Sequence, residues 1–170
     1  MIKILIVDDH PIVRKGLTQI VEETRDMIVA DEAINGQEAL KKVKAWVEID
    51  GSYDLGFGPK YSQAEQEERY ELSKCMTCGC CLESCPNYNS NSSFIGAQPL
   101  NQVRLFNTHP TGKMQEKQRT KSVMTQGGIS YCGKSQNCEA VCPKEIPLTE
   151  SISYVAWESV KEMFWGWLKK

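Results

Sequence analysis

The sequence lacks any run of about 18 apolar residues, so we expect no part of it to cross a lipid bilayer. It also lacks an excess of either charge, because 20 Lys and Arg residues nearly balance 22 Asp and Glu, and this argues against a nucleic-acid partner. The N-terminus has no features of a secretory signal peptide, which indicates a compartment where cysteines stay reduced. A length of 170 residues allows one domain or two small ones.

Cysteine is absent from the first 74 residues, and all eight cysteines lie between residues 75 and 142. Residues 75–86 have the spacing C-x2-C-x2-C-x3-C-P, and residues 132–143 have the spacing C-x5-C-x3-C-P. In bacterial ferredoxins a run of the first kind supplies three thiolates to one iron–sulfur cluster and sends the fourth to a different cluster. The two runs therefore predict two clusters, each of which takes one ligand from the other run.

The first predicted cluster has a complete set of four thiolates. Cys75, Cys78 and Cys81 come from the first run, and Cys142 crosses from the second, which predicts a [4Fe-4S] site. Cys80 is left over, and we interpret it as a small buried hydrophobic residue rather than as a ligand.

The second predicted cluster lacks one thiolate. Cys132 and Cys138 come from the second run and Cys85 crosses from the first, but Ser135 stands where a fourth cysteine would be needed. A serine oxygen is a poorer ligand for such iron than the soft sulfur of a thiolate. The spacing therefore predicts a [3Fe-4S] cluster at this site.

Two other uses of the cysteines have to be weighed. A disulfide framework conflicts with the reduced compartment expected above. Zinc is the stronger rival, since C-x2-C pairs are common zinc ligands, but a third cysteine at x2 and the repeated x3-C-P ending fit a zinc site badly.

At these residues the sequence resembles the iron–sulfur subunit of succinate dehydrogenase and fumarate reductase, including the C-x5-C-x3-C-P second run. The resemblance covers about residues 40–155 and is greatest to the form found in menaquinone-using, Bacillus-like bacteria. Besides the cysteine runs, the matching segments are residues 41–46, 53–56, 70–74, 102–112 and 142–149. In ubiquinone-reducing relatives a tryptophan follows the first C-P and a histidine follows the first cysteine of the second run. Asn87-Tyr88-Asn89 and Gly133 stand at those places here, which also favours menaquinone.

The resemblance implies an electron-transfer subunit that is not catalytic on its own. Its implied partners are a flavoprotein subunit, a membrane anchor subunit of the cytochrome b type and a quinone. Its implied place is peripheral, on the cytoplasmic side of the cell membrane. In the family, a [2Fe-2S] domain fills the positions before residue 40, and because no cysteine precedes Cys75 we expect that domain to be lacking here.

Residues 1–40 indicate a different unit, with the order strand, helix, strand, helix. An apolar run at 2–7 predicts a strand buried on both faces, and helical periodicity follows Pro11. Residues 4–11 and 32–40 resemble the start of a response-regulator receiver domain. In that family Asp8 and Asp9 would help to hold Mg²⁺, but the phospho-accepting aspartate has no counterpart, so we expect a vestigial site in a truncated fragment. A phospho-signalling receiver is therefore the alternative function.

The expected fold is mostly α, with an incomplete βαβα piece at 1–40, a connector at 41–61, an α-helical ferredoxin domain at 62–148 and an amphipathic helix at 149–170. A capping box formed by Ser62 and Glu65 predicts a helix over 62–74, and further helices are expected at 99–107 and 112–124. The aromatic stripe of the last helix suits either a membrane partner or packing on the cluster domain, and both remain open. We interpret His109 as a turn residue bonded to backbone rather than as a cluster or quinone neighbour.

Overall fold

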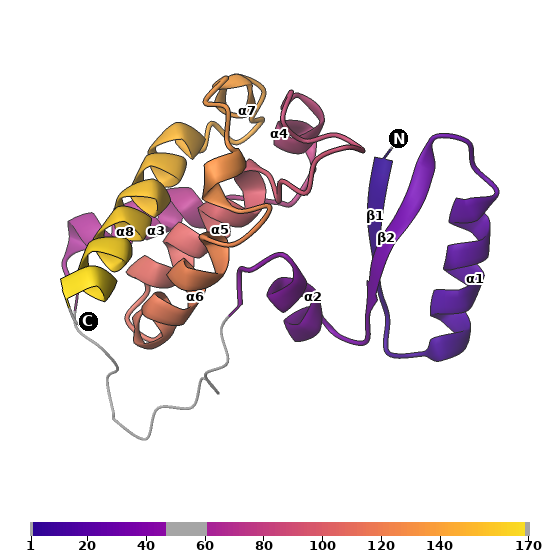
Figure 1. Ribbon diagram of the computed structural model, residues 1–170, viewed down its shortest axis with the longest axis horizontal. Helices are drawn as coiled ribbons and strands as arrows, with labels where there is room; N and C mark the ends of the chain where they lie inside the picture. The colour runs from indigo at the N-terminus through magenta and orange to yellow at the C-terminus, as the bar shows by residue number, and fades with distance from the viewer. Residues whose placement is uncertain (1, 47–60, 169–170) are drawn as a thin grey trace.

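The computed structural model describes residues 2–46 and 61–168, and it shows a small βαβα unit followed by a helical unit (Figure 1). The first unit contains β1 (Ile2–Val7), α1 (Pro11–Glu22), β2 (Met27–Ala33) and α2 (Gly36–Lys42). The second contains α3 (Gln63–Ser73), α4 (Cys80–Glu83), α5 (Ala97–Thr108), η1 (Gly112–Gln115), α6 (Glu116–Val123), η2 (Ile129–Tyr131), α7 (Asn137–Ala140) and α8 (Leu148–Leu168). Within these described ranges, no helix combines the length and the apolar character that crossing a membrane requires.

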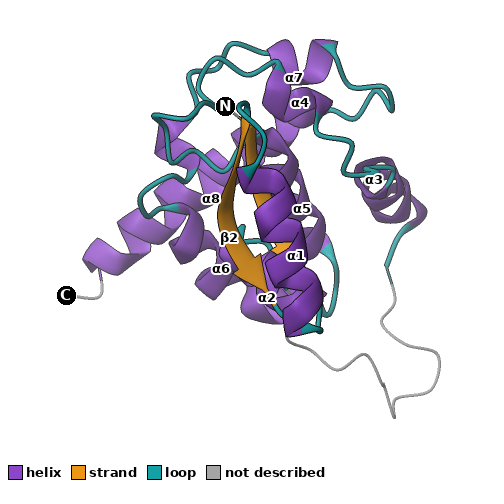
Figure 2. Cartoon of the chain, turned by 90° about the vertical axis from the view of Figure 1, so that its right-hand side faces the viewer, coloured by secondary structure: helices purple, strands orange, loops and turns teal. Residues whose placement is uncertain are grey.

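The βαβα order is as expected, but the first strand is not buried on both faces. β1 and β2 form a two-stranded parallel sheet, over which α1 lies (Figure 2). In β1 only Ile6 is buried, whereas Val7 is 42% exposed. The prediction was wrong because a sheet of only two strands offers too little surface to bury both faces of a strand.

Helix α1 presents apolar side chains to solvent and polar ones to the sheet. Ile12 is 85% exposed and Ile20 is 62% exposed. On the inner side, Arg14 Nε and Thr18 Oγ1 both donate hydrogen bonds to the Glu32 carboxylate, at 3.1 and 3.2 Å. The periodicity that predicted this helix therefore does not identify its packed face.

The helical unit is built around α5, which packs against α3 and α8. Leu100 and Val103 of α5 are fully buried, together with Leu72 of α3 and Val155 of α8. The capping box predicted for α3 is present: the Glu65 amide donates to Ser62 Oγ at 3.3 Å, and the Ser62 amide donates to the Glu65 carboxylate at 2.8 Å.

Residues 43–46 belong to the core of the helical unit, although we predicted them as part of the connector at 41–61. Ala45 is completely buried there, and Arg119 Nε donates to the Trp46 carbonyl at 2.8 Å. The Arg119 guanidinium also donates to the Asn107 side chain and to the Gly112 carbonyl, and burial lowers its pKa to about 10. The rest of the predicted connector, from residue 47 to 60, lies outside the described residues.

The boundaries of two helices also differ from the prediction. The single helix expected over 112–124 is a 3-10 turn, η1, followed by α6, with Gln115 at φ −109° and ψ 10° between them. A side chain at Gly112 would collide with the Phe106 carbonyl, so the chain is held tightly against the end of α5 where η1 begins. Helix α5 begins at Ala97, two residues before the expected start, directly after Gly96 at φ 90°.

Candidate metal centre

The two cysteine runs fold into loops of closely similar backbone conformation. Thr77 and Gly79 adopt φ angles of 55° and 81°, and their counterparts Lys134 and Gln136 adopt 57° and 63°. Each loop leads into a four-residue helix, α4 or α7, and these helices contact each other at one end of the helical unit (Figure 1). Left-handed backbone at three residues that are not glycine is strained, and such strain is typical of loops built around a functional site.

The structure brings the four thiolates predicted for the first cluster together around one cavity. Cys75, Cys78 and Cys81 line it from the first loop, and Cys142 lines it from the residues that follow α7. The cavity has a volume of about 20 Å³, and Ile146 also lines it. The crossing of Cys142 from the second run is therefore present in the fold.

A second, larger cavity holds the three cysteines predicted for the other cluster. Cys85, Cys132 and Cys138 line it, and so does Ser135, at the position that corresponds to Cys78 in the first loop. Its volume is about 400 Å³, and it extends along α8, where Trp157 forms part of the wall.

The spacing of the sulfur atoms tests what kind of metal group these cavities suit. Within residues 2–46 and 61–168, no three cysteine sulfurs lie within 4.8 Å of one another. A tetrahedral zinc ion with Zn–S bonds of about 2.3 Å would hold its sulfurs roughly 3.8 Å apart. Sets of three or four thiolates spread around a cavity fit an iron–sulfur cluster, whose several irons separate the ligands and whose chemistry selects soft sulfur.

Burial acts on the innermost cysteine of each set. Cys81 is 8% exposed, and burial, followed by the charge of nearby Cys75, raises the pKa of its thiol to about 12. Cys138 is 6% exposed, and burial likewise raises the pKa of its thiol. Metal binding would have to displace these protons, because iron is held by the thiolate form.

The burial of Cys80 differs from the prediction. It was interpreted as a buried hydrophobic residue, but it is exposed, and it lines neither cavity. Its backbone N–H and then its thiol hydrogen-bond to Cys78 and lower the pKa of the Cys78 thiol, while the pKa of Cys80 itself is raised.

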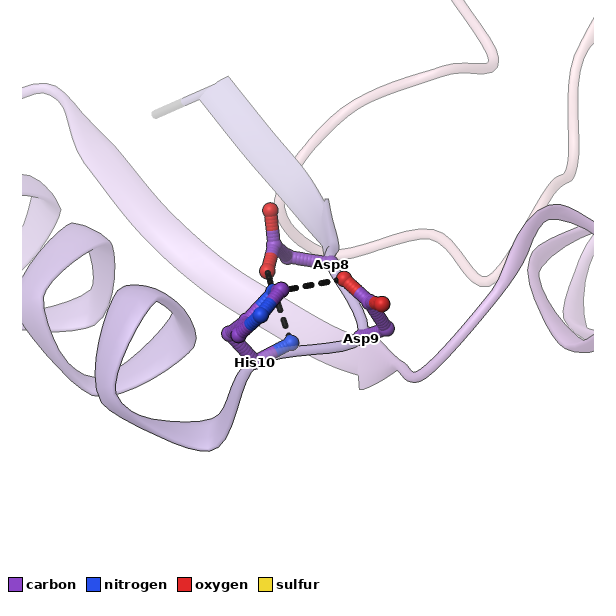
Figure 3. Close-up of side chains that lie close together, drawn as sticks. All are labelled: Asp8, Asp9 and His10. Carbon is purple, nitrogen blue, oxygen red and sulfur yellow. Dashed lines mark hydrogen bonds and ion pairs between the residues drawn. The ribbon is translucent and has the colours of Figure 1, made fainter.

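Asp8 and Asp9 lie together after β1, as predicted, and the structure adds His10 to them (Figure 3). His10 Nδ1 is 2.8 Å from Asp9 Oδ1 and 3.5 Å from Asp8 Oδ1, with all three residues partly or fully exposed. His109, the other histidine, accepts a hydrogen bond from the Thr111 amide at 3.2 Å through Nδ1, which fits the predicted turn role. The Mg²⁺ role of the two aspartates stays a prediction.

Residues 71–146 match the family described as "4Fe-4S dicluster domain". This part of the chain is therefore similar to 4Fe-4S dicluster domains. The chain is also similar to the succinate dehydrogenase iron–sulfur subunit of Bacillus subtilis, with 59% identity over 116 residues, covering 68% of this chain and 46% of that protein.

Two more distant relatives are iron–sulfur subunits of fumarate reductase. The fumarate reductase iron–sulfur subunit of Wolinella succinogenes is 28% identical over 116 residues, covering 68% of this chain and 48% of the relative. That of Escherichia coli O6:H1 is 28% identical over 148 residues, covering 85% of this chain and 58% of the relative. The chain thus spans about half the length of these relatives. The predicted similarity to these iron–sulfur subunits is confirmed, whereas its predicted extent, about residues 40–155, and the receiver resemblance stay predictions.

Proposed function

We propose that this chain is the electron-transfer iron–sulfur subunit of a succinate dehydrogenase or fumarate reductase complex. In this proposal Cys75, Cys78, Cys81 and Cys142 hold a [4Fe-4S] cluster, and Cys85, Cys132 and Cys138 hold a [3Fe-4S] cluster. The observation that carries the proposal is that two separate cavities are each lined by one of these sets, including the cysteine that crosses from the other run.

When bound, each cluster supplies one-electron redox chemistry. The residues of the chain supply ligands and surroundings rather than an acid, a base or a nucleophile. The apolar side chains of Phe94 and Ile152 line the second cavity, and Ile146 and Leu148 line the first. Such a lining limits water and lowers the local dielectric, which are two of the means by which proteins set cluster potentials.

The proposed partners are a flavoprotein that exchanges electrons with succinate or fumarate, a membrane anchor subunit of the cytochrome b type, and menaquinone. The exposed aromatic end of α8 supports the membrane-side contact: Trp157 is 62% exposed and lines the second cavity, and Phe164 and Trp167 farther along are 62% and 72% exposed. Tryptophan and phenylalanine are favoured both at protein interfaces and at the lipid headgroup layer. The proposed location is peripheral, on the cytoplasmic side of the cell membrane.

A metal and sulfide analysis of the full chain, purified without oxygen, tests the proposal. We expect a brown protein with about seven irons and eight acid-labile sulfides per chain, and with the paramagnetic resonance of an oxidised three-iron cluster. Cys138→Ala should abolish that resonance and leave the four-iron signal, while Cys81→Ala should do the reverse.

Other results would assign other functions. A colourless protein that contains zinc would refute the cluster assignment. A colourless protein that incorporates phosphate from acetyl phosphate would favour the phospho-signalling alternative for residues 1–40.

A further inference from the structure

The C-terminal half of α8 has an outer face that is apolar and exposed. This outer face consists of Trp157, Val160, Phe164, Trp167 and Leu168, which recur at intervals of three and four residues and so lie on one side of the helix. Their exposed fractions are between 49% and 72%. Resting on the proposed function, which brings the chain to a membrane, we propose that the outer face lies directly on the lipid headgroup layer and favours anionic headgroups.

The inner side of the same turns packs on the helical unit. Val155 is 1% exposed, and Ser159, four residues later, is 7% exposed. Glu162, three residues further along, is ion-paired with Lys117 and Lys121 of α6, at 3.7 and 3.5 Å. The last turns of α8 extend beyond the neighbouring helices (Figure 2). The unit therefore covers the inner side of α8 and leaves the outer face exposed.

The outer face is large enough to be an interaction site. A buried aromatic side chain covers about 150–250 Å². At their exposed fractions, Trp157, Phe164 and Trp167 together present roughly 300–490 Å² of aromatic surface, and Val160 and Leu168 add to it. The largest apolar patch on an ordinary soluble protein measures about 300–600 Å² and often has a function, such as a contact with a protein or a membrane.

The composition of this stretch favours lipid as the partner. Three of the four tryptophans of the chain lie within it: Trp157, Trp165 and Trp167. Tryptophan is enriched at the membrane–water interface, because its ring is apolar and its N–H can still bind water or a headgroup. The remaining members of the outer face are valine, phenylalanine and leucine, and the last two are typical of the buried face of interfacial helices.

The exposed charge beside the outer face is positive. Lys161 has a side chain that is 41% exposed, whereas the side chains of Glu158 and Glu162 are each 17% exposed. Glu158 is also ion-paired with Lys161. Two more lysines, Lys169 and Lys170, follow Leu168 in the sequence. Anionic headgroups attract lysines that lie near the membrane surface, so the charge and the lipid are complementary.

The length of the outer face indicates a helix that lies in the plane of the membrane. The stretch from Trp157 to Leu168 is about 18 Å long at 1.5 Å per residue, whereas the hydrocarbon core of a bilayer is about 30 Å thick. Within residues 2–46 and 61–168, no helix is able to cross a membrane. The outer face should therefore enter only about 5–10 Å, to the boundary between headgroups and acyl chains.

Vesicle binding by the full chain, purified without oxygen and free of other proteins, tests this inference. We expect the chain to sediment with vesicles of mixed phosphatidylcholine and phosphatidylglycerol, and more weakly with vesicles of phosphatidylcholine alone. Tryptophan emission should shift to shorter wavelength on binding. Bromine atoms on the acyl chains should quench this emission more strongly near the headgroups than near the centre of the bilayer.

Three variants test the residues involved. Phe164→Ser removes a ring from the outer face and lies in neither cavity, so vesicle binding should weaken about fivefold or more at unchanged iron content. Ile12→Ser is the matched control, because it removes an apolar side chain that is 85% exposed in α1, and it should bind like the unsubstituted chain. Lys161→Gln should weaken binding to the mixed vesicles by up to about fivefold and leave binding to phosphatidylcholine unchanged.

Iron analysis of the same samples separates this inference from the function on which it rests. An unsubstituted chain without iron would refute the proposed function. A chain with its iron that binds neither kind of vesicle would overturn only the lipid contact, and so would vesicle binding that Phe164→Ser leaves unchanged. A dimer that Phe164→Ser converts to a monomer, with no binding to vesicles, would also overturn it, because the outer face would then bind a second copy of the chain.

Discussion

Replacing Ser135 by cysteine would complete the second ligand set. Ser135 lines the second cavity together with Cys85, Cys132 and Cys138, and its loop has nearly the backbone angles of the loop that carries Cys78. The substitution changes the side-chain oxygen of an exposed residue to sulfur. We therefore expect Ser135→Cys to convert a three-iron site into a four-iron site.

The size of the change follows from the ligand count. Iron should rise from about seven to about eight per chain, while acid-labile sulfide stays at about eight. The resonance of the oxidised three-iron cluster should disappear, and a second four-iron signal should appear on reduction. Iron analysis and paramagnetic resonance on the same anaerobic sample measure both effects.

Ser153→Cys is a suitable control, because Ser153 lines the same cavity from α8 rather than from the cysteine loop. This variant should keep the three-iron resonance and about seven irons. A Ser135→Cys protein with an unchanged resonance and iron content would refute the assignment of Cys85, Cys132 and Cys138 to a three-iron site.

Four further predictions concern stability. Leu100→Ala should lower the free energy of unfolding by about 2–5 kcal/mol in urea denaturation, because Leu100 is fully buried, whereas Ile12→Ala, at 85% exposure, should change it by less than about 0.5 kcal/mol. Arg119→Ala leaves the buried Asn107 and Gly112 oxygens and the half-buried Trp46 carbonyl without their donor; at about 1–3 kcal/mol for each buried group, it should cost about as much as Leu100→Ala in the same assay. Ser62→Ala removes an N-cap and should cost about 1 kcal/mol. Chelation of iron should reduce the helical circular dichroism signal, because metal-binding free energy contributes to folding in small metal-holding domains; an unchanged spectrum after complete iron loss would show that the fold does not depend on metal.

The grouping of the cysteines could be predicted because it depends on local spacing and on one rule about crossing. The capping box of α3 could be predicted for the same reason, since all its atoms lie within four residues. Contacts between residues that lie far apart in the chain leave no comparable pattern in the sequence. Nothing near Arg119 in the sequence indicates that its guanidinium binds the carbonyl of Trp46, 73 residues earlier.

The N-terminal unit shows a second limit of sequence reasoning. Periodicity located α1 correctly after Pro11, but it could not tell whether the apolar side had anything to pack against. With two strands in the sheet, Ile12 and Ile20 stay exposed. Cys80 was misjudged for a related reason, because its surroundings depend on the turn at Gly79 rather than on the type of the residue itself.

Helices α4 and α7 act as spacers of one helical turn between the two cavities. Cys81 lines the first cavity and Cys85 lines the second. In the other run the order is reversed, since Cys138 lines the second cavity and Cys142 lines the first. Four residues of helix rise by about 6 Å, so the gap between the two centres is set by hardly more than one turn of backbone. Inserting a single residue into either turn would rotate the following cysteine by about 100° and detach it from its cavity, which makes the length of these short helices as restrictive as the identity of the cysteines.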